Sequence, residues 1–176
     1  MIIVNTGTGK GKTTAALGQA LRAVGEGKRV LMVQFIKGPW KSGEDILLEN
    51  DKFLISNFKI VKTGRGFVGI LDDTLPIEEH RKAAEEGLAL ARKEIESGNW
   101  DIVILDEVNN AVQLNLISKE AVSELINLST GKLEHLILTG RGAPSEFIDR
   151  ADLVTEMRDI KHPYEQGIKA KRGLEY

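Results

Sequence analysis

A glycine-rich turn near the start of the chain carries lysine and threonine side chains among its glycines. It ends in Gly11-Lys12-Thr13, follows the apolar residues Ile2–Val4 and opens an amphipathic segment. Backbone N–H groups of such a turn converge on phosphate oxygens, the lysine reaches the terminal phosphates, and the Thr13 hydroxyl is suited to ligate Mg²⁺. The strict motif begins with glycine, where this chain has Thr6. We predict a phosphate-binding loop; the alternative is a Gly- and Lys-rich surface turn after an edge strand.

Two acidic residues form the second candidate group. Asp106 and Glu107 directly follow the apolar run Ile102–Leu105. Carboxylates at the carboxyl end of a buried strand, beside a phosphate loop, can hold Mg²⁺ or its coordinated waters. We predict this role for the pair; alternatively, Asp106 only caps the helix that follows.

Four further side chains are weaker candidates. Arg141 follows a predicted strand, so it either lies near the ligand or is a solvated turn arginine. Phe67 stands between nearby glycines, a position that is hard to explain as core and would suit a flat ligand. We expect His162, which precedes a proline, to be structural rather than catalytic, and Trp100 to pack against the core.

These residues fall between strands and helices that alternate along the chain. Short apolar runs predict strands at residues 2–4, 30–35, part of 53–61, 102–105, 136–139 and 153–157. Helical periodicity predicts helices over residues 12–25 and 77–97, a third with Ser118 as its N-cap and a short fourth near Pro144. This alternation is typical of an α/β fold with a mostly parallel sheet and helices on both faces. Such sheets bind ligands beyond the carboxyl ends of their strands.

Composition narrows the function classes. The chain has 176 residues, and we expect residues 1–176 to form a single domain. Its 24 Lys and Arg against 26 Asp and Glu give a net charge of −2, which argues against a nucleic-acid or membrane partner. The absence of cysteine excludes thiol nucleophiles and Cys-type zinc sites. Without a membrane-length apolar run or a leader before the first strand, we expect a soluble, cytoplasmic protein.

The residues alone therefore indicate an enzyme of the P-loop class that uses a Mg-nucleotide, and they do not select one reaction. An ATPase, a small-molecule kinase, a nucleic-acid motor and a transferase share both motifs. The short, slightly acidic chain argues against a motor. The lack of an Arg-rich lid segment argues against a typical kinase.

Over its whole length the sequence resembles the P-loop type of ATP:corrinoid (cob(I)alamin) adenosyltransferase. The stretches that carry the resemblance are residues 6–18, Val33–Gly38 with Trp40 and Gly43-Glu44, Gly64–Phe67, Leu105–Asn109, Leu138–Pro144, Asp152–Met157, Lys161–Pro163, Gly167–Ala170 and Gly173–Tyr176. The GRGAP sequence at 140–144 and the C-terminal stretches are the most specific of these.

The resemblance implies transfer of the 5′-deoxyadenosyl group of ATP to the cobalt of cob(I)alamin, with release of triphosphate. It also implies a RecA-like P-loop fold, a homodimer, Mg²⁺ or Mn²⁺ as the metal, and an electron-donor flavoprotein that reduces the cobalt. ATP then lies across the loop in the reverse of the usual direction, so that the ribose C5′ meets the nucleophile. Because cob(I)alamin is itself strongly nucleophilic, the protein supplies positioning and stabilisation of the triphosphate rather than a base.

The same resemblance assigns roles to individual residues. Lys12 and Glu107 are the catalytic residues, and Thr13, Asp106 and Glu107 hold the metal. Phe67 faces the corrin. The nucleotide- and corrinoid-binding set comprises Thr6, Gly7, Thr8, Gly9, Lys10, Gly11, Lys12, Thr13, Thr14, Phe67 and Arg141.

The sequence departs from the family's pattern in two places. Where relatives continue with Thr-Trp after the phenylalanine, this chain has Val68-Gly69, and Trp40 is a candidate for the missing aromatic. Many relatives also carry a segment before the first strand that helps to cover the site. Here we expect the first strand to start at Ile2, so that this segment is absent. Two other functions stay open: a phosphotransferase or ATPase that uses the γ-phosphate, and a non-catalytic carrier of adenosylated corrinoid.

Overall fold

One six-stranded sheet organises the protein. The computed structural model describes residues 1–50, 56–70 and 73–174. The strand order is β3-β2-β4-β5-β1-β6, and all neighbouring strands run parallel. The strands are β1 (Ile2–Thr6), β2 (Val30–Gln34), β3 (Phe58–Lys62), β4 (Ile102–Asp106), β5 (His135–Thr139) and β6 (Leu153–Glu156). The predicted parallel α/β architecture is confirmed. The strand predicted within 53–61 starts at Phe58, and residues 53–55 lie outside the described part.

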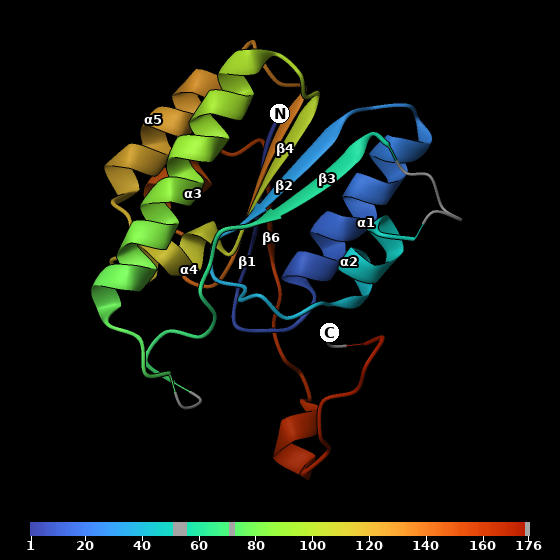
Figure 1. The fold of residues 1–176 in the computed structure, drawn as a ribbon, viewed down its shortest axis with the longest axis vertical. Helices are drawn as coiled ribbons and strands as arrows, with labels where there is room; N and C mark the ends of the chain where they lie inside the picture. Colours follow the sequence, from blue (N-terminus) through green and yellow to red (C-terminus); the bar gives the residue numbers. More distant parts are fainter. Residues whose placement is uncertain (51–55, 71–72, 175–176) are drawn as a thin grey trace.

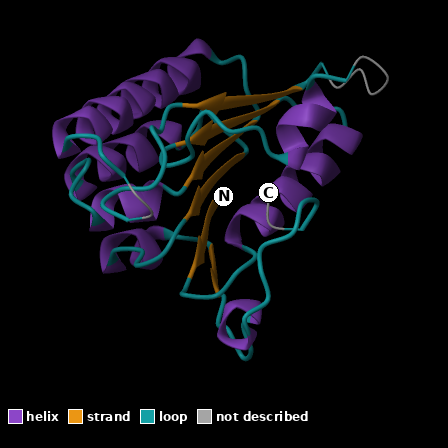
Figure 2. Ribbon diagram, turned by 60° about the horizontal axis from the view of Figure 1, so that its bottom comes forward, coloured by secondary structure: helices purple, strands orange, loops and turns teal. Residues whose placement is uncertain are grey.

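Helices cover both faces of the sheet (Figure 1). On one side lie α1 (Lys12–Gly25) and α2 (Gly43–Leu48), and on the other α3 (Ile77–Ser97), α4 (Val108–Gln113) and α5 (Lys119–Ser129). The short α6 (Ser145–Arg150) packs through Phe147 into the same hydrophobic cluster as α5. Figure 2 shows the sheet edge-on between these layers, with the 3₁₀ turn η2 (Pro163–Gln166) apart from them.

The helix boundaries agree with the sequence signals. The helices predicted at 12–25 and 77–97 have those bounds, and Gly98 ends the second with φ +69°. Ser118 caps α5 through its hydroxyl, which accepts a hydrogen bond from the backbone N–H of Ala121 at 3.1 Å. The pattern missed α2 and α4 because each has six residues, too few for a helical period to be read.

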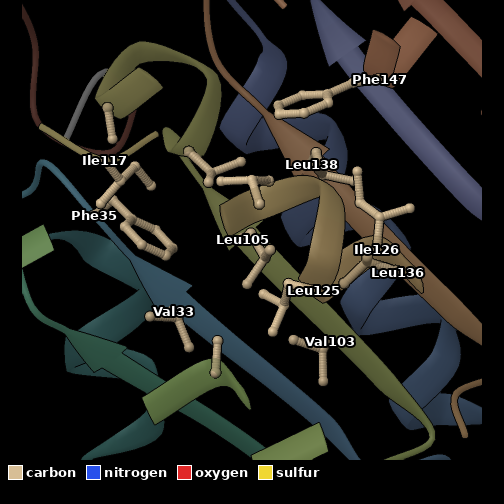
Figure 3. Packing of buried hydrophobic residues seen from close by; sticks show 14 of the residues in the cluster. Val33, Phe35, Val103, Leu105, Ile117, Leu125, Ile126, Leu136, Leu138 and Phe147 are labelled. Atoms are coloured by element: carbon tan, nitrogen blue, oxygen red, sulfur yellow. The ribbon is translucent and has the colours of Figure 1, made fainter. Parts of the chain in front are cut away.

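The larger of two hydrophobic clusters among the described residues lies between the sheet and the α3–α5 layer, and the smaller lies between the sheet and α1. Figure 3 shows strand residues such as Val103 and Leu105 facing Leu125 and Ile126 of α5. Every residue of β2 and β4 is buried, which explains their continuous apolar sequences. Trp100 packs against this cluster as predicted. In the described part of the chain, no helix combines the length and apolarity that crossing a bilayer requires.

Candidate active site

Polar residues lie at or near the carboxyl ends of four apolar strands, along one edge of the sheet. Gln34 of β2 pairs in register with Asp106 of β4, and Asn5 of β1 pairs with Thr139 of β5. A hydrogen bond of 2.7 Å from the Thr139 hydroxyl to Asp106 joins the two pairs. All four residues are almost fully buried. The strands thus place one row of buried polar groups across β2, β4, β5 and β1, at the end where parallel sheets bind ligands.

Asp106 is the centre of this row. Its Oδ1 accepts hydrogen bonds from the hydroxyls of Thr13, at 2.9 Å, and Thr139. Its Oδ2 accepts one from Gln34 Nε2 at 3.1 Å. Burial raises the pKa of Asp106, and these hydrogen bonds act in the opposite direction. Glu107, not Asp106, occupies the position before α4, so the alternative in which Asp106 merely caps a helix is wrong.

Glu107 is held in an unusual backbone conformation. Its φ is +62°, in the left-handed region, and its N–H donates to the Thr139 hydroxyl at 2.9 Å. Burial, and to a smaller extent the charge of Asp106, raises the pKa of Glu107 to about 7. The nearby charges of Lys12 and Lys37 oppose this shift. A further cation bound here would stabilise the ionised carboxylate.

The predicted phosphate loop lies beside these acids, and its lysine points inward. Lys12 Nζ donates to the carbonyl oxygens of Gly7, at 2.9 Å, and Gly9, at 2.5 Å. Burial lowers the pKa of Lys12, while the charge of Glu107 raises it. The hydroxyl of Thr13 ties the first turn of α1 to Asp106. The sequence prediction that the loop and the two acids meet is therefore confirmed.

The turn after β5 completes this side of the site. The Thr6 hydroxyl accepts a hydrogen bond from the Ala143 N–H at 3.2 Å, which links the loop to residues 140–144. Arg141 in that turn is exposed, and its charge shifts the pKa of both Lys12 and Glu107. The turn therefore brings Arg141 near the loop.

Several buried polar atoms at this edge have no protein partner. Within the described residues these include Asn5 Nδ2, Gln34 Oε1, Glu107 Oε2 and Asn109 Oδ1. Buried polar groups are almost always paired, with protein, water or ligand. Their gathering here indicates that a ligand, an ion or ordered water completes the site. Sequence reasoning missed Asn5, Gln34 and Thr139; the signal was a polar residue near the end of each apolar strand.

Two exposed aromatic side chains lie side by side in the segments that follow β2 and β3. The rings of Trp40 and Phe67 have centroids 6.1 Å apart and planes tilted by 33°. A Cβ on Gly38 would lie 2.4 Å from the indole, and one on Gly66 would lie 2.7 Å from it. These glycines allow both segments to approach the indole closely. Trp40 is nonetheless 62% exposed and Phe67 48% exposed.

A cavity lies next to the two segments that carry the aromatic pair, although neither ring lines it. Its volume is about 680 Å³, and its lining includes Gly38, Gly64 and Arg65 together with Glu79 of α3. Lys62, at the end of β3, donates from Nζ to the Trp40 carbonyl oxygen at 2.6 Å and thereby joins the two segments. Small-molecule sites have volumes of roughly 300–1,000 Å³, so the cavity is large enough for a ligand.

Comparison with known proteins assigns the family. Residues 1–176 match the family described as "ATP:corrinoid adenosyltransferase BtuR/CobO/CobP". The chain belongs to this family. It is 39% identical over 176 residues to "Corrinoid adenosyltransferase" of Escherichia coli (strain K12), covering 100% of this chain and 85% of the relative.

Two further corrinoid adenosyltransferases have a similar percentage identity to this chain. The chain is 38% identical over 181 residues to "Corrinoid adenosyltransferase CobA" of Salmonella typhimurium, covering 100% of this chain and 85% of the relative. It is 39% identical over 177 residues to a "Corrinoid adenosyltransferase" of Sinorhizobium sp., covering 100% of this chain and 80% of the relative. The resemblance inferred from the sequence is thus confirmed.

The donor set of this adenosyltransferase-family chain suits a metal that arrives with its substrate. In the described residues no cluster of three or more His, Cys, Asp or Glu side chains forms a metal site. The partnerless Oε2 of Glu107 and the Thr13 hydroxyl are oxygen donors that Mg²⁺ accepts. Because Mg²⁺ keeps several waters and takes further ligands from phosphates, one carboxylate and one hydroxyl are a fitting set.

An Asp–His pair fixes the loop that carries Phe67. The Asp73 carboxylate accepts hydrogen bonds from the N–H groups of Gly69, at 2.8 Å, and Leu75, at 3.1 Å. His80 Nε2 lies 3.0 Å from Asp73 Oδ2, and its side chain is 2% exposed. The Gly69 N–H above all, with the other contacts, lowers the pKa of Asp73. Sequence reasoning assigned His80 no role, although its spacing to Ala84 already placed it on the buried face of α3.

Proposed function

We propose that this chain transfers the 5′-deoxyadenosyl group of ATP to the cobalt of a reduced corrinoid and releases triphosphate. The observation that carries the proposal is that one sheet edge bears both a phosphate loop and an exposed aromatic pair beside a cavity. The loop suits the polyphosphate of ATP, and the aromatic rings suit a flat macrocycle. A γ-phosphate transferase would have no use for the second feature.

The reaction divides the work between substrate and protein. The cobalt of the corrinoid attacks C5′ of the ribose, the Co–C bond forms, and the C5′–O bond breaks with its electron pair going to triphosphate. Loop N–H groups, the Lys12 ammonium and Arg141 hold the triphosphate and stabilise the charge it gains. Thr13 and Glu107 would hold Mg²⁺ or Mn²⁺, with Asp106 orienting the Thr13 hydroxyl; the metal would supply charge neutralisation. No general base is needed because no proton moves.

The proposal extends to location and assembly. We expect a homodimer, because Leu153 and Val154 of the edge strand β6 are 43% and 38% exposed and open edges favour pairing. We expect the protein to act in the cytoplasm, where ATP is available, and to receive electrons for the cobalt from a flavoprotein. Nucleic acids and membranes are not expected as partners.

The products of ATP distinguish the proposal from its alternatives. The protein, MgATP and chemically reduced corrinoid are expected to yield a light-sensitive Co–C product and one triphosphate for each adenosyl group transferred. Absorbance spectroscopy and ion-exchange analysis measure the two products. ADP with phosphate would instead favour a phosphotransferase or ATPase. Tight corrinoid binding without turnover would indicate a carrier, and equal product without the protein would overturn catalysis.

Replacing either exposed aromatic is expected to weaken corrinoid binding. Trp40→Ala and Phe67→Ala each should raise the KM for corrinoid about tenfold, because stacking area against the macrocycle is lost. The KM for ATP should stay unchanged. Leu21→Ala, which removes a 62%-exposed apolar side chain from α1, is the matched control. An equal effect of all three variants, or a rise in the KM for ATP alone, would contradict the assignment.

A further inference from the structure

A C-terminal segment lies against the phosphate loop. We call residues 157–159, which follow β6, the strap. The Met157 N–H donates to Thr6 O at 2.8 Å and continues the pairing of β1 with β6. The Gly9 N–H donates to Met157 O at 2.8 Å. A Cβ on Gly9 would lie 2.7 Å from the carbonyl carbon of Arg158, so the loop and the strap are in direct backbone contact.

The strap also brings a carboxylate to the loop. The Lys10 N–H donates to Asp159 Oδ1 at 3.1 Å. A carboxylate oxygen on a loop N–H is chemically the counterpart of a phosphate oxygen, since both are anionic acceptors. The charge of Asp159 also raises the pKa of Lys12, against the larger effect of burial. The Asp159 carboxylate therefore lies within electrostatic reach of the lysine that the polyphosphate needs.

Three donors of the loop have protein acceptors in this structure. The N–H groups of Gly9 and Lys10 bond the strap, and Lys12 Nζ bonds two loop carbonyls. A polyphosphate that takes these donors must displace the acceptors they now have. The Asp159 carboxylate must then leave the Lys10 N–H, because two anions at one donor repel each other.

We propose that the Asp159 carboxylate is an internal competitor for the triphosphate group: it holds the Lys10 amide when the loop is free, leaves when polyphosphate binds, and returns to promote triphosphate release. The inference rests on the proposed function for the presence of triphosphate at the loop. Its consequence is kinetic as well as thermodynamic. Triphosphate carries several negative charges and is held by many donors, so a returning anion accelerates its release from the loop.

Binding of inorganic triphosphate tests the competitor directly. Asp159→Asn keeps an oxygen that can accept from the Lys10 N–H but removes the charge. We expect this variant to bind magnesium triphosphate about tenfold more tightly than the parent, with most of the change in the dissociation rate. Calorimetry gives the affinity and stopped-flow displacement gives the rate. Asp159→Ala, which also removes the acceptor, is expected to tighten binding at least as much.

Glu156→Gln is the matched control, because it removes the same charge from the residue next to the strap. The Glu156 carboxylate bonds Arg158 rather than the loop, so we expect less than a twofold effect. Equal tightening by Glu156→Gln and Asp159→Asn would reduce the effect to net charge and overturn the proposal. Unchanged or weaker binding by Asp159→Asn would overturn it too. Failure of the parent itself to bind triphosphate would instead refute the proposed function.

Discussion

Lys12→Ala is expected to abolish most adenosyl transfer. The side chain reaches into the loop, where its Nζ donates to the carbonyl oxygens of Gly7 and Gly9. We propose that its ammonium stabilises the charge that triphosphate gains as it leaves. Loss of one such stabilising group from a preorganised site lowers kcat/KM by about 100- to 1,000-fold. The measurement is the rate of Co–C product formation at saturating corrinoid, with triphosphate determined in parallel.

A surface lysine provides the control for Lys12. Lys28 lies just before β2, at the opposite end of the sheet, and pairs with Glu134. Lys28→Ala should leave the rate within a factor of about two, because exposed ion pairs contribute little. Turnover of Lys12→Ala at the rate of the parent would show that the loop does not hold the leaving group.

Glu107→Gln is expected to make the protein more stable and less active. Because the folded state raises the pKa of Glu107 from 4.5 to about 7, it retains a proton that the unfolded chain has already lost between these pH values. Stability from this group therefore falls as pH rises from about 4.5 to 7, and the loss is complete above pH 7. It amounts to at most about 3 kcal/mol at 1.36 kcal/mol per pH unit. Glutamine removes this cost.

Two measurements check the Glu107 prediction. Denaturant unfolding without ligand at pH 8 should give Glu107→Gln a higher free energy of unfolding than the parent, and the difference should shrink towards pH 5. Transfer activity should fall about 100-fold, because the carboxylate proposed to hold the metal is gone. A variant less stable than the parent at pH 8 would contradict the raised pKa.

Glu44→Gln is the control of opposite sign. Burial acts to raise the pKa of Glu44, but the hydrogen bond and charge of Lys37, the Glu44 backbone N–H and the Ser42 side chain together outweigh it, and the pKa is lowered. Ionised Glu44 therefore stabilises the fold above its unfolded pKa, and Glu44→Gln should lower the free energy of unfolding at pH 8. The two variants thus compare a half-buried carboxylate whose charge is not compensated, Glu107, with one that is paired to a lysine, Glu44.

Local patterns were sufficient for the elements and for the two main motifs. The 12–25 and 77–97 helices, the buried strands and the phosphate loop depend on residues close in sequence, so their period and their flanking residues predict them. Phe67 was also predictable as a residue outside the core, because it stands between glycines. Trp40 was only a candidate for the missing aromatic, since the two residues lie on different loops. The close approach of these loops at Gly38 and Gly66 exists only in the folded chain.

Strand register produced the rest of the site. The row of Gln34, Asp106, Thr139 and Asn5 exists because four strands that lie far apart in the sequence pair with their polar ends aligned; Asn5 and Thr139 are 134 positions apart. The residues that flank each member of the row in the sequence do not predict which strand will lie beside it in the sheet. The partnerless atoms of Gln34 and Asn5, and the pKa of Glu107, depend on that alignment.

The amino-acid sequence by itself determined the parallel α/β order, the position of the glycine-rich turn before α1 and the family, because these follow from periodicity and from short contiguous motifs. Only the tertiary structure decided which groups share the site: the strap residue Asp159 at the Lys10 amide, 149 positions away in the chain, and the Asp73–His80 pair beneath the aromatic loop. The physical reason is that these contacts depend on the order of the strands in the sheet and on the close approach of backbone segments that are distant in sequence. Both exist only in the folded chain.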